Sequence, residues 1–195
     1  DVLAGYQQEN EKWDHVGAYR DGFPTDLIHV LDGGSKENWS NDGSATHWAI
    51  ASFIGSLNYD YASKYLLSLK MRSDGSSRLA SGQRWSTFPS VSAAWRISAE
   101  SFMEKTRNYL DDLKIRASWG LTGATTGIGL YPSYSTIGFG NAALGNQYIL
   151  SAYLSGLGNT DLGWEKTSML DFGFDARMLD NRLGVNFNYF YGKTS

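Results

Sequence analysis

The feature that most constrains the fold is an alternation of apolar and polar residues, with a period of two, in five separate segments. In one of them, Leu113, Ile115 and Trp119 alternate with charged or small polar residues. Successive side chains of a β-strand point to opposite faces of a sheet. The pattern therefore predicts an all-β protein whose strands have one apolar and one polar face. The five segments are 65–72, 90–97, 113–122, 170–178 and 183–192; weaker alternation at 1–8 and 48–60 raises the expected total to about seven strands.

The segments between the expected strands alternate between short and long. Short turns fall at 60–64 and 179–182, and a medium link at 98–112 has the residues of a helix start, so one short helix is expected there. Brief periplasmic turns and long outer loops are typical of antiparallel barrels in outer membranes, whereas a soluble sandwich has no reason to keep its long loops at one end. The expected long outer loops are 9–47, 73–87 and 123–163.

The length of the strands and the position of the aromatic residues favour a membrane barrel. Strands of roughly ten residues can cross a bilayer when tilted. Aromatic residues make up 14% of the chain and gather near the strand ends, as in the aromatic girdles at membrane interfaces. The alternative is a soluble β-sandwich whose aromatic residues fill a core. The residues concerned are Tyr59, Tyr61 and Tyr65 at one end and Trp85, Phe88, Trp164 and Tyr191 at the other.

Several functional classes lack their usual residues. The chain has no cysteine, which excludes a disulfide scaffold and cysteine-ligated metal. Its formal net charge is −3, without a basic tract, so nucleic acid is not an expected partner. His15, His29 and His47 do not have the spacing of a helical metal motif, and no nucleophile or carboxylate pair stands out. We therefore expect no enzymatic activity, no cofactor and no metal site.

The charged residues of the polar faces indicate which face lies inside a barrel. A charge that faces lipid at the bilayer midplane costs about 2–4 kcal/mol. These side chains are therefore expected to face the lumen, where opposite charges on neighbouring strands could pair. The candidate lumen-facing residues are Arg96, Lys114, Arg116, Asp171, Asp175 and Arg177.

Several stretches, in order, resemble the SusC/RagA-type TonB-dependent transporters of the Bacteroidetes outer membrane. They lie within 53–122 and 159–195, whereas 9–47 and 123–158 show no such resemblance. The matching motifs are Asp74–Arg78, Arg84–Trp85, Phe88–Ser98, Leu113–Gly123, Asn159–Thr167, Phe172–Asp175 and Asn181–Leu183.

The resemblance implies a 22-stranded outer-membrane barrel, with an N-terminal plug that is opened through TonB. It also implies a SusD-like surface lipoprotein as a cap, and oligosaccharides or peptides as cargo. No plug or TonB box is recognised in this sequence, which corresponds to part of the barrel domain, and seven strands cannot close a barrel that has an even number of strands from eight upward. In such a protein the lumen-facing charges are expected to contact the plug. Contact with the cargo is the alternative.

Aromatic residues in the expected outer loops are the candidates for contact with the cargo, because rings provide contact area at low entropic cost. They could equally pack the loops against each other or against the cap. They are Trp13, Tyr19, Trp39, Tyr131, Tyr134 and Tyr148. Two further functions stay open: a soluble β-sandwich that binds glycans, and a simple outer-membrane pore or adhesin without TonB coupling.

Overall fold

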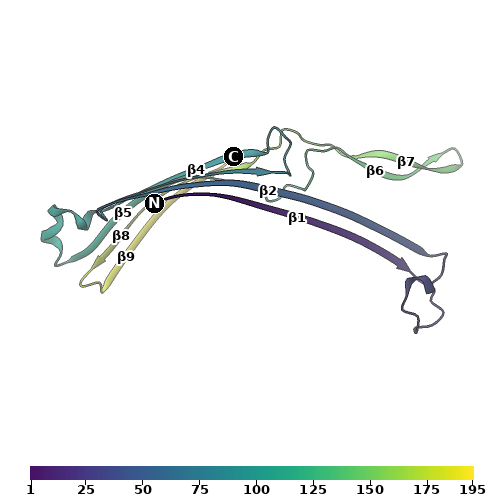
Figure 1. Ribbon diagram of the computed structural model, residues 1–195, viewed down its shortest axis with the longest axis horizontal. Coiled ribbons are helices and arrows are strands. Elements are labelled where there is room, and N and C mark those ends of the chain that lie inside the picture. Colours follow the sequence, from purple (N-terminus) through teal and green to yellow (C-terminus); the bar gives the residue numbers. More distant parts are fainter.

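The computed structural model describes all residues 1–195 and is an all-β structure. Seven strands form one antiparallel sheet in the order β1-β2-β3-β4-β5-β8-β9, and β6 and β7 form a separate hairpin (Figure 1). The sheet is a single curled layer with no second layer packed on it, as Figure 1 shows. The strands are β1 (Val2–Arg20), β2 (Trp39–Tyr61), β3 (Tyr65–Ser76), β4 (Trp85–Arg96), β5 (Leu110–Ala124), β6 (Thr136–Leu144), β7 (Gln147–Gly156), β8 (Glu165–Met178) and β9 (Leu183–Thr194).

The predicted apolar face is continuous across the sheet. Residues that are register partners on neighbouring strands share a face, and two rows cross all or most of the strands with apolar or aromatic residues only. Only 8 of 195 residues are buried, so these side chains have no protein core to fill. The first row is Val2, Leu57, Leu69, Val91, Trp119, Leu170 and Tyr191; the second is Tyr59, Leu67, Ala93, Ala117, Phe172 and Tyr189.

Aromatic rings border this apolar face at both ends. At the end with the short turns, the ring of Tyr65 stacks on Tyr61 and on Trp95, with centroids 6.3 Å apart in each pair. At the other end, Phe53 stacks on Trp85 at 5.8 Å and contacts Tyr6 at 5.3 Å. Phe53 and Tyr61 are separated by about 27 Å along β2, at about 3.4 Å per residue, a length that suits a tilted strand in a bilayer.

Phe88 and Trp164 differ from the expected rim positions. Phe88 is buried, on the opposite face from the girdle residues, and its ring meets Trp164 edge to face at 5.4 Å. The indole nitrogen of Trp164 donates a 2.8 Å hydrogen bond to the carbonyl of Arg84. The pair therefore fixes the chain before β8 to the loop before β4.

The expected loop boundaries were wrong where the strands continue beyond the alternating pattern. β1 and β2 pair from Val2–Leu57 to Arg20–Trp39, so the predicted loop 9–47 shrinks to 21–38. The predicted loop 73–87 shrinks to 77–84, and 123–163 becomes 125–164 and contains the β6–β7 hairpin. Figure 1 shows this hairpin and the tip of β1–β2 projecting from the same end of the sheet.

The predicted short helix at 98–112 is present as two 3-10 helices, η2 (Ile97–Ala99) and η3 (Ser101–Thr106). Neither has a side-chain hydrogen bond at its N-cap, so the expected helix-start residues do not act as a cap. A third 3-10 helix, η1 (Leu31–Gly33), lies between β1 and β2. No helix in the chain has both the length and the apolar composition needed to cross a membrane.

Candidate functional site

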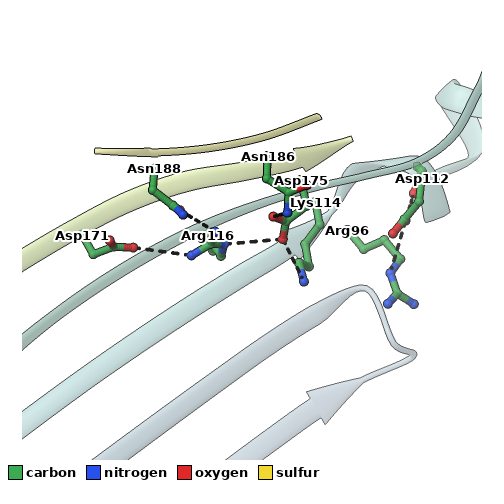
Figure 2. Close-up of polar contacts among 9 residues, drawn as sticks. Arg96, Asp112, Lys114, Arg116, Asp171, Asp175, Asn186 and Asn188 are labelled. Carbon is green, nitrogen blue, oxygen red and sulfur yellow. Dashed lines mark hydrogen bonds and ion pairs between the residues drawn. The ribbon is translucent and has the colours of Figure 1, made fainter. Parts of the chain in front are cut away.

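The polar face of β5 and β8 carries a cluster of ion pairs (Figure 2). Lys114 and Asp175 are register partners, and the Lys114 ammonium lies 3.1 Å from the Asp175 carboxylate. The Arg116 guanidinium lies 3.4 Å from Asp175 and 3.6 Å from Asp171. The two bases are two residues apart on β5 and the two acids are four apart on β8, so the pleat brings all four side chains to one face. The sequence prediction that these charges pair is therefore confirmed.

Three residues that the sequence did not single out complete this cluster. The Asn186 side chain on β9 donates a 2.9 Å hydrogen bond to Asp175, and Arg116 donates one to Asn188. Asp112 pairs with Arg96 at 3.5 Å (Figure 2). Asn186 and Asn188 occupy polar positions of the alternating segment 183–192, which is the signal that could have identified them, whereas Asp112 lies in the link 98–112.

Arg177 is the exception among the six predicted residues. It is the register partner of Asp112 on the same face, yet its side chain is exposed and makes no ion pair or hydrogen bond. The Asp112 carboxylate pairs with Arg96 on β4 instead. The structure thus brings together five of the six predicted residues.

A second polar group lies toward the other end of the same face. The Arg72 Nε donates to both carboxylate oxygens of Asp74, at 2.7 and 2.9 Å, and its Nη2 donates to Ser52 Oγ at 2.9 Å. Asp74 and Ser52 are buried. Asp74 falls in the expected loop 73–87, but β3 continues to Ser76, so the spacing of Arg72 and Asp74 places both on one strand face. This group was missed for that reason.

Glu100 forms a third polar centre in the turn after β4. Its carboxylate accepts hydrogen bonds from the Tyr65 phenol at 2.7 Å, the Trp95 indole at 3.2 Å and the Lys64 ammonium at 3.2 Å. The pKa of Glu100 is lowered, chiefly by the hydrogen bond from Tyr65 and then by those from Trp95 and Lys64. Two aromatic rings of the girdle are thereby fixed to the turn through one carboxylate.

The six predicted aromatic residues fall into two separate groups. Trp13 and Tyr19 lie on β1 and Trp39 begins β2, so these three belong to a long hairpin and not to the loop expected for them. Tyr131 and Tyr134 lie in the segment before β6, and Tyr148 lies on β7 with 84% of its surface exposed. No ring stack or side-chain hydrogen bond joins any two of the six; the Tyr134 backbone N–H donates to the Tyr131 carbonyl at 3.1 Å.

Two of these aromatic residues have structural contacts. The Trp13 ring stacks on His15 at 5.5 Å, and His15 lies 3.1 Å from the Asp42 carboxylate on β2. The Tyr131 hydroxyl donates to the carbonyl of His47 at 3.3 Å and accepts from its backbone N–H at 3.0 Å. Tyr131 thus ties the segment before β6 to the edge of β2.

The polar groups provide charge pairing and hydrogen bonding along one face of a single sheet. Across the chain, no three His, Asp or Glu side chains lie close enough to share a metal ion. Such a face suits contact with the polar surface of another part of the protein or of a ligand. The opposite face, apolar with an aromatic border, suits contact with lipid.

The family model and the similar proteins all point to TonB-dependent receptors. The family model described as "TonB dependent receptor-like, beta-barrel" matches residues 2–195. The chain is 36% identical over 195 residues to a TonB-dependent receptor of Formosa agariphila, a match that covers 99% of this chain and 19% of that protein. It is 34% identical over 154 residues to the TonB-dependent receptor SusC of Bacteroides thetaiotaomicron, covering 77% of this chain and 15% of SusC.

The fold is similar to that of solved transporters. The structure of the RagAB peptide importer in its closed-closed state matches 99% of this chain and 21% of the matched chain, with a TM-score of 0.86 and 30% identity. The open-open state of the same importer gives the same TM-score at 29% identity. The chain spans about a fifth of the length of the proteins that it matches.

Proposed function

The chain belongs to the family of TonB-dependent receptor β-barrels, and we propose that it forms part of the wall and outer surface of an outer-membrane transporter that imports oligosaccharides or peptides. In this proposal the barrel is of the SusC/RagA type, and the plug and the TonB box lie outside residues 1–195. The protein is placed in the outer membrane, and its role is transport and not catalysis.

The observation that carries the proposal is the row of seven apolar side chains from Val2 on β1 to Tyr191 on β9. If this face met water, it would be a very large exposed apolar patch, which soluble proteins rarely keep. If the polar face met lipid, each charge would cost about 2–4 kcal/mol at the midplane. The arrangement of lowest free energy puts the apolar face in the bilayer and the ion-pair cluster in the lumen, against the plug.

The β6–β7 hairpin supports a cap protein as a partner. Ile137, Phe139, Leu150 and Leu154 share one face of this hairpin and are between 58% and 75% exposed. Residues 117–160 contain no charged side chain. An isolated two-stranded hairpin is at best marginally stable in water, so an apolar surface should cover it. We assign that role to a SusD-like surface lipoprotein, which would also deliver the cargo.

We infer the class of cargo from the similar proteins and from the aromatic residues of the projecting segments. RagAB is a peptide importer, and SusC is one of several similar proteins named as TonB-dependent receptors. We assign cargo contact to Trp13, Tyr19, Trp39, Tyr131, Tyr134 and Tyr148, which lie in the part of the chain that projects beyond the apolar face. Rings can stack on a sugar or on a peptide side chain, so these residues fit both classes.

The experiment uses the full-length receptor in its own outer membrane. We expect it in the membrane fraction, and we expect deletion of its gene to abolish uptake of one class of oligomer, oligosaccharide or peptide. Deletion of tonB should abolish the same uptake. Recovery of the receptor in the soluble fraction would favour the β-sandwich alternative, and uptake that persists without TonB would favour the simple pore.

A further inference from the structure

The turn 97–109, which joins β4 to β5, crosses the end of the sheet from the polar face to the apolar face. Near its start, Ser98 donates a 2.7 Å hydrogen bond to the carboxylate of Asp112, which lies on the polar face. Two residues later, the Glu100 carboxylate accepts hydrogen bonds from two rings of the girdle that borders the apolar face. The chain that follows Glu100 therefore begins on the side of the apolar face.

The 3-10 helix η3 within this turn has one packed side and one exposed side. A 3-10 helix has three residues per turn, so residues three apart lie one above the other. Met103 and Thr106 are half-buried, and the Thr106 hydroxyl donates to the Met103 carbonyl at 2.7 Å. Phe102 and Lys105, which are also three apart, are both exposed, with 65% of Phe102 accessible. The helix therefore presents an aromatic ring and an ammonium group together on its exposed side.

Two cations of this turn have no partner in the chain. Lys105 and Arg107 are exposed, and neither has a carboxylate within ion-pair distance or a side-chain hydrogen bond. Glu104 is exposed and pairs with neither of them. Glu100, the other acid of the turn, lies 3.2 Å from the Lys64 ammonium. Both cations are therefore available to an anion outside the chain.

More apolar surface adjoins the exposed side of η3. Tyr109, the last residue of the turn, is 72% exposed, and Leu179 in the turn between β8 and β9 is 53% exposed. The Leu179 backbone N–H donates to the Tyr109 carbonyl at 3.3 Å, so the two turns are joined. Figure 1 shows the 3-10 helices at the end of the sheet opposite to the β6–β7 hairpin. Exposed apolar side chains thus gather beyond the girdle at the end with the short turns.

The parts of the barrel outside residues 1–195 do not account for this exposed side of η3. β4 and β5 lie inside the sheet, between β3 and β8, so strands that complete the barrel would add at β1 and β9. The plug would lie against the polar face, whereas Glu100 fixes the start of η3 to the border of the apolar face. Phe102 and Lys105 are therefore left for a surface other than the wall or the plug.

An aromatic ring beside two cations suits the surface of a phospholipid bilayer. Aromatic rings lie at the level of the lipid headgroups, and cations of segments that lie in the interface are attracted to anionic lipid. A guanidinium group can also donate two parallel hydrogen bonds to a phosphate. The exposed side of η3 continues the girdle formed by Tyr61, Tyr65 and Trp95, so the bilayer surface that meets the girdle also meets the turn.

We propose that the turn 97–109 is a phospholipid-binding site on the periplasmic side of the membrane. Phe102 enters the headgroup layer, and Lys105 and Arg107 bind the phosphate of a headgroup. The inference rests on the membrane location proposed above. It assigns this turn a ligand that import of the cargo does not itself require.

The test is photocrosslinking of the full-length receptor in isolated outer membranes. The crosslinking residue p-benzoylphenylalanine replaces Phe102 in one variant, Phe172 on the apolar face in a second and Ser118 on the polar face in a third. Mass spectrometry identifies the molecule joined to each position, and we expect phospholipid at 102 and 172 but not at 118. The site is refuted if position 102 joins only to protein, or to nothing, while 172 joins to phospholipid. Failure at both positions would overturn the membrane location as well, so the two failures are distinguishable.

A second set of variants tests the two cations. Lys105→Gln combined with Arg107→Gln should lower the yield of phospholipid crosslinks at position 102 by roughly fivefold or more, the factor expected for one cation near an anionic lipid surface. Lys105→Arg combined with Arg107→Lys keeps both charges and should keep the yield. Lys36→Gln, which removes an exposed cation without an ion pair between β1 and β2, should leave the yield unchanged. A wild-type yield in the neutral double variant would refute phosphate binding by the turn.

Discussion

The Tyr65 phenol donates a 2.7 Å hydrogen bond to the Glu100 carboxylate, which links the first residue of β3 to the turn that follows β4. Trp95 and Lys64 donate to the same carboxylate. One side chain thus holds two rings of the girdle and the basic residue before β3. Because the rings border the apolar face, Glu100 fixes the position of that border relative to the turn.

The first prediction concerns pH. Since the pKa of Glu100 is lowered in the folded state, its contribution to stability is present above the ordinary glutamate pKa of about 4.3 and is lost as the pH falls through the lowered value. The protection of the backbone amides in 97–109 of the full-length receptor, measured against the intrinsic exchange rate at each pH, should therefore fall on acidification below pH 4. Glu100→Gln should exchange faster at neutral pH and change less on acidification. Glu104→Gln, on the same turn without a side-chain partner, should behave as wild type; an unchanged acid response in Glu100→Gln would contradict the assignment.

The second prediction concerns the Asp175 carboxylate. Asp175→Asn keeps the shape of the side chain but leaves Lys114 and Arg116 without their shared counter-charge. The three side chains are 24–33% exposed, so we expect a loss of about 1–2 kcal/mol, less than for a fully buried pair. Urea unfolding of the receptor in detergent micelles measures it. Arg177→Gln, which removes an unpaired charge from the same strand, should stay within about 0.5 kcal/mol; equal losses in the two variants would show that the pairing contributes nothing.

The third prediction tests which face meets lipid. Phe172 lies in the second apolar row, and Phe172→Arg should reduce folding stability in lipid vesicles by about 2–4 kcal/mol if this row is near the midplane. Ser118 is the register partner of Asp171 on the polar face, so Ser118→Arg places the same charge beside a carboxylate. Ser118→Arg should therefore reduce the folding stability by much less than Phe172→Arg. A larger loss for Ser118→Arg would reverse the assignment of the two faces.

The fourth prediction concerns Gly123, whose hydrogen atoms face the buried ring of Phe88. A Cβ at Gly123 would overlap that ring. Gly123→Ala should therefore displace Phe88 from Trp164 and cost about 1–3 kcal/mol, as for overpacking in a core. Gly184→Ala on β9, where a Cβ meets nothing within 4 Å, is the control and should be close to neutral. Thermal unfolding of both variants gives the comparison, and a neutral Gly123→Ala would mean that the ring can move aside.

The fifth prediction concerns the contact between Tyr131 and His47. Tyr131→Phe removes both hydrogen bonds to the His47 backbone and keeps the ring. Cleavage of the segment 125–135 by a protease should accelerate by roughly two- to tenfold, which corresponds to about one net hydrogen bond. Tyr134→Phe serves as the control, because the Tyr134 hydroxyl makes no hydrogen bond. If both variants are cleaved at the wild-type rate, the contact does not restrain the segment.

The sequence predicted most of the fold because one face of each strand must be apolar along the band that the aromatic residues border. This requirement imposes a period of two on strands such as 113–122, and the pattern can be read without knowing the partner strand. Two of the strand pairs, β2–β3 and β8–β9, agree with the short turns expected at 60–64 and 179–182, since short turns join antiparallel neighbours. The pairing of Arg116 with Asp171 and Asp175 was accessible for the same reason: alternation puts all three on the polar face.

The outer halves of β1 and β2 could not be predicted in this way. Residues such as Glu11, Trp13 and His15 lie beyond the apolar band, where both faces of the strand are exposed and no alternation is required. Their strand conformation depends on hydrogen bonds to residues 39–49, far away in the sequence. Trp13, Tyr19 and Trp39 were assigned to a loop because the local sequence does not encode this pairing.

The sequence by itself determined that the chain forms antiparallel strands with an apolar and a polar face, because that information is local and repeats every second residue. Only the tertiary structure decided which side chains meet across strands. It joined Glu100 to Tyr65, joined Arg72 to Asp74, and left Arg177 without an ion pair. Each of these outcomes depends on register, and register is fixed by contacts between residues that are distant in sequence.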